Sequence, residues 1–387
     1  MPSDDRLQAR VAARLGALHE ARLSRTLEAP RGIDFCSNDY LVLSQHPLLK
    51  ARMIDAVERE GTGSTGSRLL RGQRDCFLEI ERQFAAFKRT DRALYFSSGY
   101  LANIAVLTTF PEEGDTIFSD ERNHASLIDG TRLSAAHRVV FPHNDVEALA
   151  SLLRESCGKG QAFIVTESLF SMDGDRAPLT DYAALCRSTG AALIVDEAHA
   201  VGVVGARGSG AIEAAGIDED VFVSVNTAGK ALGVSGAFVT GRSLTIEYLV
   251  QRARPFIFST APPPAVAAAI GAALDIVASE PERRVRLSDL SCRLRARLGD
   301  AGLFVPAGTS QIIPVVLGEN ERAIGVARAL QDQGFDVRAI RPPSVPPGTA
   351  RLRFTVNVGL DELTIDRVAE ALAAAVGGLP RCPAVFS

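Results

Sequence analysis

Short runs of apolar residues alternate with helical patterns from residue 92 to residue 240, and this alternation constrains the fold more than any other feature of the chain. The runs are ALYF (93–96), DTIFSD (115–120), FIVTE (163–167), ALIVD (192–196), VFVSV (221–225) and GAFVT (236–240). Helical patterns begin between them, near residues 100, 125 and 182. Continuous apolar strands separated by helices are typical of a mainly parallel sheet that helices cover on both faces. The sequence therefore predicts an α/β protein.

A different rhythm begins at residue 312. A strand (312–317) precedes a helix (322–334), two strands (FDVRAI, 335–340, and RLRFT, 351–355) and a final helix (365–376). This order predicts a separate small α+β lobe, and 387 residues are more than one core usually holds. We expect an N-terminal helical segment (1–45), a large lobe (46–278) and a small C-terminal lobe (279–387). The boundary lies within a long helical region, 264–298, that is interrupted near Pro281.

The charge pattern indicates a metabolic protein with no nucleic acid or membrane partner. The formal net charge is −4, and Lys and Arg are scattered along the chain. The first residues, MPSDDRLQARVAARLG, form an amphipathic helical pattern without the apolar core of a secretory signal. The most apolar segment, 262–278, is too short to span a bilayer. We expect a cytoplasmic location.

The six cysteines include no C-x-x-C pair, so neither a zinc site nor a disulfide framework is indicated. We expect reduced thiols, although a nucleophilic cysteine stays an alternative. The cysteines are Cys36, Cys76, Cys157, Cys186, Cys292 and Cys382.

Two charged residues follow neighbouring strands of the predicted sheet. Asp196 ends the run 192–196, and Lys230 follows the run 221–225. Charged residues at the carboxyl ends of such strands point where ligands bind, and a lysine there can form a Schiff base. Pyridoxal 5'-phosphate requires a carboxylate for its pyridine nitrogen, a lysine for its aldehyde and a cradle for its phosphate. The pair predicts a pyridoxal-phosphate site. A turn aspartate and a surface lysine are the alternative.

A candidate phosphate cradle follows the run 93–96. Ser98, Gly99 and Tyr100 open a helix, where free backbone N–H groups and the helix dipole favour an anion. Thr227, three residues before Lys230, is the candidate second phosphate ligand. An ordinary strand-to-helix turn would give the same pattern.

Three further residues are candidates for the edge and face of the cofactor ring. His199 lies three residues after Asp196 and is close enough to reach the phenolic oxygen. Ser171, in TESLFSMDGD, offers a hydroxyl to the same edge, or it caps a turn. His124, in DERNHASLIDG, follows a strand end and is a candidate to stack on the ring, whereas an isolated histidine is more often structural.

Residues 61–66, GTGSTG, match the dinucleotide-binding pattern G-x-G-x-x-G. That fingerprint follows a buried strand and opens a helix, whereas this segment follows the charged helical pattern KARMIDAVEREG. We therefore expect these glycines to allow a close approach to a ligand or to a neighbouring subunit, and a nicotinamide site is disfavoured.

The order of SSGYLAN, NHASLIDG, TESLFSMDGD, VDEAHAVGVVG and NTAGKALGVSG resembles the α-oxoamine synthases. The resemblance begins at SNDYL and covers nearly the whole chain. These are fold-type I pyridoxal-phosphate enzymes that join an amino acid to an acyl thioester with loss of carbon dioxide. The resemblance implies catalytic roles for Lys230, His124, Asp196 and His199, and a homodimer with active sites at the interface.

Residues 312–320 and 339–355 are similar to those of the member that condenses L-alanine with a pimeloyl thioester, carried by coenzyme A or acyl carrier protein, in biotin biosynthesis. The resemblance implies that Arg353 receives the amino-acid carboxylate and that Ser344 lies near the substrate. It also implies a substrate contact by an N-terminal arginine, for which Arg25 is the best match.

Two positions depart from the family pattern. Phe77 stands where a histidine is common, and Ala261 stands where a hydroxyl often contacts the partner subunit's phosphate. Ser259 or Thr260 could substitute for that hydroxyl. The departures concern substrate detail and the phosphate site across the subunits.

Two other functions stay open at this point. One is a related synthase that uses glycine or serine, such as a 2-amino-3-ketobutyrate ligase, an aminolevulinate synthase or a sphingoid-base synthase. The other is a cofactor-binding or scaffold protein that kept the fold without catalysis.

Overall fold

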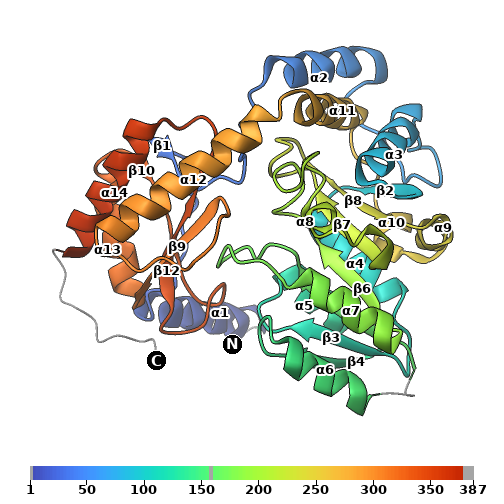
Figure 1. Cartoon of the computed structure of the whole chain (residues 1–387), viewed down its shortest axis with the longest axis horizontal. Coiled ribbons are helices and arrows are strands. Elements are labelled where there is room, and N and C mark those ends of the chain that lie inside the picture. Colours follow the sequence, from blue (N-terminus) through green and yellow to red (C-terminus); the bar gives the residue numbers. More distant parts are fainter. Residues whose placement is uncertain (1–2, 157–159, 378–387) are drawn as a thin grey trace.

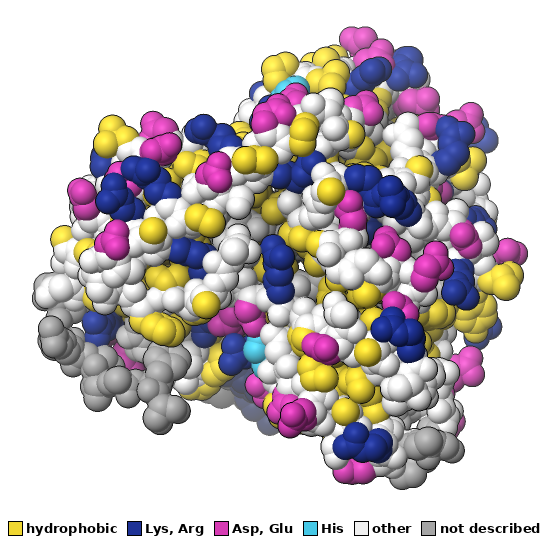
Figure 2. Space-filling model, in the orientation of Figure 1, with side chains coloured by type: hydrophobic (Ala, Val, Ile, Leu, Met, Phe, Trp, Pro, Cys, Tyr) yellow, Lys and Arg dark blue, Asp and Glu magenta, His cyan; other side chains and the backbone are white. Residues whose placement is uncertain are grey.

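The computed structural model describes residues 3–156 and 160–377, and these form two lobes joined by a long helix (Figure 1). Cys157 and Cys382 lie outside the described residues. Basic and acidic side chains are interspersed over the face drawn in space-filling form (Figure 2). The expected α/β architecture is confirmed.

The large lobe is built on a seven-stranded sheet with the order β2-β8-β7-β6-β5-β3-β4. Only β8 runs antiparallel to its neighbours. The carboxyl ends of β3, β5, β6 and β7 therefore meet at one edge of the sheet. The strands are β2 (Arg92–Phe96), β3 (Thr116–Asp120), β4 (His137–Phe141), β5 (Ala162–Glu167), β6 (Ala192–Asp196), β7 (Val221–Thr227) and β8 (Ala237–Gly241).

Both faces of this sheet are buried, which explains its continuous apolar strands. Ile194 packs in one core cluster and Val195 in another, because successive side chains point to opposite faces. The helices are α2 (Pro47–Glu60), α3 (Asp75–Lys88), α4 (Gly99–Thr109), α5 (Ala125–Leu133), α6 (Val146–Glu155), α7 (Leu179–Thr189), α8 (Ala211–Ala215), α9 (Ser243–Arg252), α10 (Arg254–Ile257) and α11 (Pro264–Ser279), with the 3-10 helix η1 (Asp218–Asp220).

The small lobe contains the antiparallel sheet β11-β12-β9 and a parallel pair of β1 with β10. The N-terminal β1 thus joins a C-terminal strand. The elements are α1 (Ser3–Glu20), β1 (Ile33–Asp34), α12 (Glu282–Asp300), β9 (Ile312–Gly318), α13 (Asn320–Gln331), β10 (Phe335–Asp336), β11 (Ala339–Ile340), β12 (Ala350–Thr355) and α14 (Glu362–Gly377). The division at residues 45 and 278 stays a prediction.

Two local expectations need correction, and a third is confirmed. The segment 335–340 is not one strand, because β10 pairs with β1 whereas β11 pairs with β12. The N-terminal helix ends at Glu20, since Arg22 adopts a left-handed conformation (φ 57°) that stops it. The predicted interruption of the helical region 264–298 near Pro281 is confirmed, because α11 and α12 meet there at an angle of 76°.

Within the described residues no single helix is long and apolar enough to cross a membrane. Only the bent pair of α11 and α12 reaches the required length and composition together.

Candidate active site at the carboxyl ends of the strands

The carboxyl ends of β5, β6 and β7 bring two carboxylates and a lysine to one edge of the sheet. Glu167 ends β5 and lies directly opposite Asp196, which ends β6. Lys230 follows β7 in a turn that contains Gly233. Gly233 has φ 68°, and a Cβ atom there would lie 2.4 Å from the backbone nitrogen of Ser44. This turn therefore packs directly against the N-terminal segment.

Lys230 is the first member of a buried hydrogen-bonded chain. Its Nζ lies 2.7 Å from Nε2 of His199, and Nδ1 of His199 lies 2.5 Å from the hydroxyl of Tyr40. Gln311 donates to the backbone carbonyl of His199 at 3.0 Å. His199 therefore contacts Lys230 of the large lobe, Tyr40 of the N-terminal segment and Gln311 of the small lobe.

Burial controls the protonation of this chain. It lowers the pKa of Lys230 to about 8, against the opposing charge of Asp196 and that of Glu167 once this acid is ionised. Burial, reinforced by the charge of Lys230, lowers the pKa of His199 well below its ordinary value. Near neutral pH His199 is therefore neutral, and a useful fraction of Lys230 is an unprotonated amine.

Asp196 is buried and held by two donors. Asn103 Nδ2 donates to Oδ2 of Asp196 at 2.7 Å, and the backbone nitrogen of Ala198 donates to Oδ1 at 2.8 Å. The other polar atom of the Asn103 side chain, Oδ1, is buried without a hydrogen-bond partner. The predicted carboxylate is therefore fixed at the strand end that the sequence indicated.

His124 caps the start of α5, where its Nδ1 lies 2.8 Å from the hydroxyl of Ser126. Ser126 also accepts from Asn103 at 2.9 Å, which links His124 to Asp196 through two side chains. The ring keeps an exposed side, but its partial burial still lowers its pKa. The structure brings His124 into the cluster that the sequence predicted.

Glu167 is a buried acid that the sequence analysis did not assign. Burial, followed by the charge of Asp196, raises its pKa to about 8, so it is mostly protonated at neutral pH. Oε2 accepts from the backbone nitrogen of Ser171 at 3.2 Å, and Oε1 has no partner. Ser171 is buried and its backbone nitrogen is fixed on this acid.

The residues that the sequence predicted to form an anion site lie at the start of α4. Ser98 caps the helix by accepting from the backbone nitrogen of Leu101 at 3.3 Å, and the amides of Gly99 and Tyr100 belong to its unpaired first turn. A Cβ atom on Gly99 would lie 3.8 Å from the hydroxyl oxygen of Thr227. Thr227 is therefore beside the helix start. The Tyr100 side chain is exposed and its hydroxyl donates to Asp129, so only its backbone fits this role.

Arg353 reaches the site from β12 of the small lobe. Its Nη2 donates to Oδ1 of Asn38 at 3.0 Å, and its buried Nε has no partner. Asn38 also accepts from the hydroxyl of Tyr40 at 3.2 Å, which connects Arg353 to the chain of His199 and Lys230. A buried guanidinium with an unpaired N–H suits an anionic group such as a carboxylate.

Ser344 belongs to the loop after β11, and Arg25 belongs to the N-terminal segment between α1 and β1 that contacts this loop; within the described residues neither shares a hydrogen bond with the cluster. Both are exposed. Nη2 of Arg25 donates to the carbonyl of Pro342 at 3.4 Å. The backbone nitrogen of Ser344 donates to the carbonyl of Arg341 at 3.1 Å. The structure brings Arg25 to the loop that carries Ser344, and their predicted substrate contacts stay predictions.

The glycine-rich segment 61–66 follows α2, as the sequence suggested, and not a strand. Gly66 accepts from the backbone nitrogen of Ala261 at 2.9 Å, and Ser67 forms a β-bridge with Thr260. Phe77 is fully buried, and the guanidinium of Arg68 lies 4.9 Å above its ring. Phe77 is therefore a core residue that covers a buried arginine.

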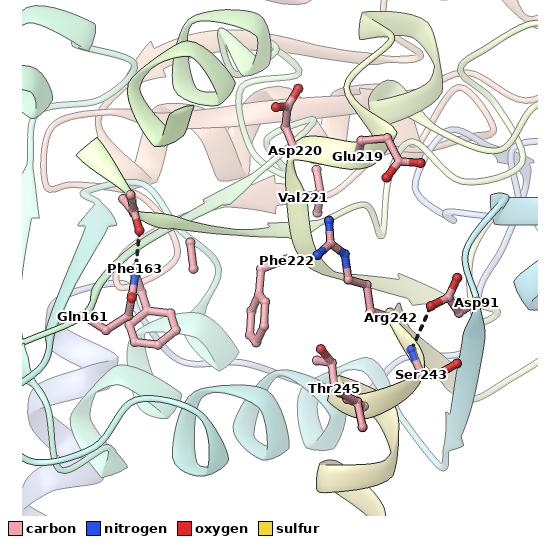
Figure 3. A pocket seen from close by; sticks show the side chains of 14 residues that line it. Asp91, Gln161, Phe163, Glu219, Asp220, Val221, Phe222, Arg242, Ser243 and Thr245 are labelled. Carbon is pink, nitrogen blue, oxygen red and sulfur yellow. Dashed lines mark hydrogen bonds between the residues drawn. The ribbon is translucent and has the colours of Figure 1, made fainter. Parts of the chain in front are cut away.

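A separate cavity of about 660 Å³ lies at the opposite, amino-terminal edge of the same strands (Figure 3). The rings of Phe163 and Phe222 form part of its wall, and Arg242 reaches toward it from the end of β8. None of the predicted site residues lines it. Within the described residues, no group of three or more His, Cys, Asp or Glu is arranged to hold a metal ion.

Residues 30–372 match the family of class I and II aminotransferases. The chain is 46% identical to the 8-amino-7-oxononanoate synthase of Marinobacter nauticus, over 88% of this chain and 86% of the relative. It is also 46% identical to the protein of that name from Anaeromyxobacter dehalogenans, over 96% of each chain. The chain belongs to the 8-amino-7-oxononanoate synthase family.

Solved structures of related proteins share the fold of this family. Serine palmitoyltransferase from S. paucimobilis, solved with a bound PLP–myriocin aldimine, has a TM-score of 0.89 and 30% identity, over 95% of this chain and 98% of its own. The resemblance to the α-oxoamine synthases and the fold-type I architecture are confirmed.

Proposed function

We propose that this chain is a pyridoxal-phosphate-dependent acyltransferase that condenses L-alanine with a pimeloyl thioester. The products are 8-amino-7-oxononanoate, carbon dioxide and the free thiol, in biotin biosynthesis. The observation that carries the proposal is Lys230, whose Nζ lies 2.7 Å from Nε2 of His199. Its pKa of about 8 reflects burial opposed by the strand-end acids Asp196 and Glu167.

The residues present fit pyridoxal 5'-phosphate. The amides at the start of α4 and the hydroxyl of Thr227 would hold the phosphate, and Asp196 would hold the pyridine nitrogen. Lys230 would bind the aldehyde, and His199 would accept or share a hydrogen bond with the phenolic oxygen. Oδ1 of Asn103 and Oε1 of Glu167 are buried without a hydrogen-bond partner, which favours binding of a polar ligand at this edge.

The cofactor, when bound, supplies an electron sink for the bonding electrons released at the amino acid's Cα. Arg353 would pair with the substrate carboxylate and thereby orient the Cα–H bond. Lys230, as a free amine, would accept the Cα proton, and its low pKa suits that role near pH 8. The protonated Glu167 would donate a hydrogen bond at the same edge without adding charge. His124 would cover the cofactor ring.

Alanine is favoured over serine because the named relatives at 46% identity are 8-amino-7-oxononanoate synthases, whereas the serine palmitoyltransferase is 30% identical. A glycine- or serine-using synthase is the alternative function. The acyl carrier is coenzyme A or acyl carrier protein.

A homodimer in the cytoplasm completes the proposal. Leu70 and Phe258 are 83% and 70% exposed, and they belong to neighbouring loops joined by the bridge of Ser67 with Thr260. Large apolar side chains exposed together favour a covered interface. The hydroxyl of Thr260, which is exposed on this loop, would contact the phosphate in the partner subunit.

Thiol release measures the proposed reaction directly. The purified protein is supplied with pyridoxal phosphate and pimeloyl-coenzyme A, and L-alanine, glycine and L-serine are added separately. We expect thiol release with L-alanine, together with 8-amino-7-oxononanoate by mass spectrometry. Release with glycine or serine alone would support the alternative synthase. A protein that binds the cofactor but releases thiol with none of the three would be a scaffold.

A further inference from the structure

The loop that carries Ser171, residues 168–178, is attached to both lobes. On the large lobe, Asp175 accepts from Nε2 of His143 at 2.6 Å and from Nδ2 of Asn144 at 3.0 Å. Nδ1 of His143 lies 2.9 Å from Asp120, the last residue of β3. One half of the loop is therefore fixed to the edge of the large sheet.

The other half of the loop contacts the small lobe. Asp173 forms an ion pair with the buried Arg351 on β12. The hydroxyl of Ser310 donates to the carbonyl of Gly174 at 2.5 Å. Gly174 has φ 71°, and a Cβ atom there would lie 2.3 Å from the carbonyl oxygen of Ile312, so the two backbones are in direct contact. Asp173 also pairs at 3.4 Å with Arg122, which is exposed and belongs to the large lobe.

Arg351 and Arg353 are two residues apart on β12, so both side chains project from the same face of the strand. Arg353 reaches Asn38 and carries the unpaired Nε that suits a carboxylate. Arg351 reaches the loop whose Ser171 is fixed on Glu167. One strand thus connects the proposed carboxylate receptor to the proposed cofactor edge.

We propose that Arg351 is a positioning residue for the amino-acid substrate. Its ion pair with Asp173 sets the position of β12, and therefore of Arg353, relative to Ser171 and Glu167. This inference rests on the proposed function, because it takes Arg353 to be the receptor of the substrate carboxylate. Loss of the pair would displace the receptor from the reacting carbon without removing any group that touches the substrate.

The test compares Asp173→Asn, Arg351→Gln and the double variant with Arg122→Gln. Arg122→Gln is the matched control, because it removes an ion pair with the same Asp173 but within one lobe. We expect the KM for the amino acid to rise about tenfold in both single variants, with a smaller change in kcat, because a displaced receptor weakens substrate orientation. Arg122→Gln should change KM by less than about threefold, as is usual for an exposed pair. Asp173→Glu should restore most of the loss.

A second measurement needs neither cofactor nor substrate. Amide hydrogen exchange in cofactor-free protein should become faster across residues 168–178 in Arg351→Gln and stay unchanged in Arg122→Gln. The double variant should resemble each single one, since all three variants lose the same pair of Asp173 with Arg351. Wild-type KM and wild-type loop exchange in Arg351→Gln would overturn the inference. A lowered melting temperature with unchanged KM would also overturn it, by showing a purely structural pair. If the wild-type protein used serine or glycine, the proposed function would fail, and KM for that amino acid would test the pair instead.

Discussion

Lys230 differs from a surface lysine because burial holds its pKa near 8, while Asp196 and, once it is ionised, Glu167 favour its charged form. The two opposing effects leave the amine able to lose and regain a proton close to neutral pH. His199, neutral and bonded to Tyr40, keeps the Nζ in place without adding a charge. The residue's chemistry therefore depends on groups from three separate parts of the chain.

The protonation of Lys230 gives a pH-dependent prediction. In cofactor-free protein, the rate at which an amine reagent labels the Lys230 peptide should rise with pH around a midpoint near 8. Because Asp196 raises that pKa, Asp196→Asn should lower the midpoint by about one unit or more. Peptide mapping between pH 6 and pH 10 measures both midpoints. A midpoint near the ordinary lysine value in the wild-type protein would contradict this description.

The sequence predicted the residues that follow strand ends and missed those that depend on distant packing. Asp196, Lys230 and His199 could be placed because a parallel sheet collects its carboxyl ends at one edge. Glu167 ends β5 by the same rule and could have been found in the same way. Tyr40 is 159 positions from His199, so no local pattern indicates that contact.

At the scale of elements, a buried ion pair fixes the turn after β6. Lys88, at the end of α3, pairs with Glu197 and also donates to the carbonyl of Ser209. Oε1 of Glu197 accepts from the first amides of α8, at 2.6 Å from Ala211 and 3.1 Å from Ile212. Because Glu197 directly follows Asp196, this network joins α3 and α8 to the turn that carries the site.

Lys88→Met should lower the free energy of unfolding by about 3–5 kcal/mol, because it leaves the Glu197 carboxylate buried without its partner. Urea denaturation measures the change. Arg59→Ala, which removes the exposed pair with Asp55, is the control and should change it by less than about 1 kcal/mol. Equal changes in the free energy of unfolding in the two variants would show that burial does not make the Lys88 pair more important for stability than an exposed pair.

The His143 cluster makes the stability of the fold depend on pH. Asp120 and Asp175 raise the pKa of His143 to about 9, although its burial acts against them. A raised pKa in the folded state stabilises the protein fully below the unfolded value of about 6.5, and the stabilisation is lost as pH rises toward 9. The melting temperature of the wild-type protein should exceed that of His143→Gln by several degrees at pH 6, and the difference should shrink by pH 9.5. A difference that is constant with pH would contradict the charged bridge.

Element types followed from the periodicity of the sequence, whereas pairing partners did not. The segment 335–340 is predicted as one strand, but its two halves pair with β1 and β12. The partner β1 is a two-residue strand about 300 positions earlier, too short to be recognised from its own sequence.

At the scale of the whole molecule, the site lies between lobes that contribute different functions. The large lobe presents Lys230 and Asp196, and the small lobe presents Arg353 on β12. Segment 33–45 connects them, since β1 pairs with β10 while Tyr40 bonds to His199. Small changes in the distance between lobes should therefore alter amino-acid binding before they alter cofactor binding.

The proposed homodimer has a simple test. Light scattering after size-exclusion chromatography should give a mass near twice 41.1 kDa. Replacing the exposed Leu70 and Phe258 with aspartate should shift the mass toward that of one chain, because charged groups resist burial. An unchanged mass in this double variant would place the interface elsewhere.

In the proposed site, Lys230 holds pyridoxal phosphate at the strand ends. The most direct test is reduction of the cofactor-loaded protein with sodium borohydride, followed by peptide mass spectrometry. We predict a pyridoxyl group on the peptide that contains Lys230, and no label on that position in Lys230→Ala. A label on another lysine, or no label after saturation with the cofactor, would contradict the assignment of this site.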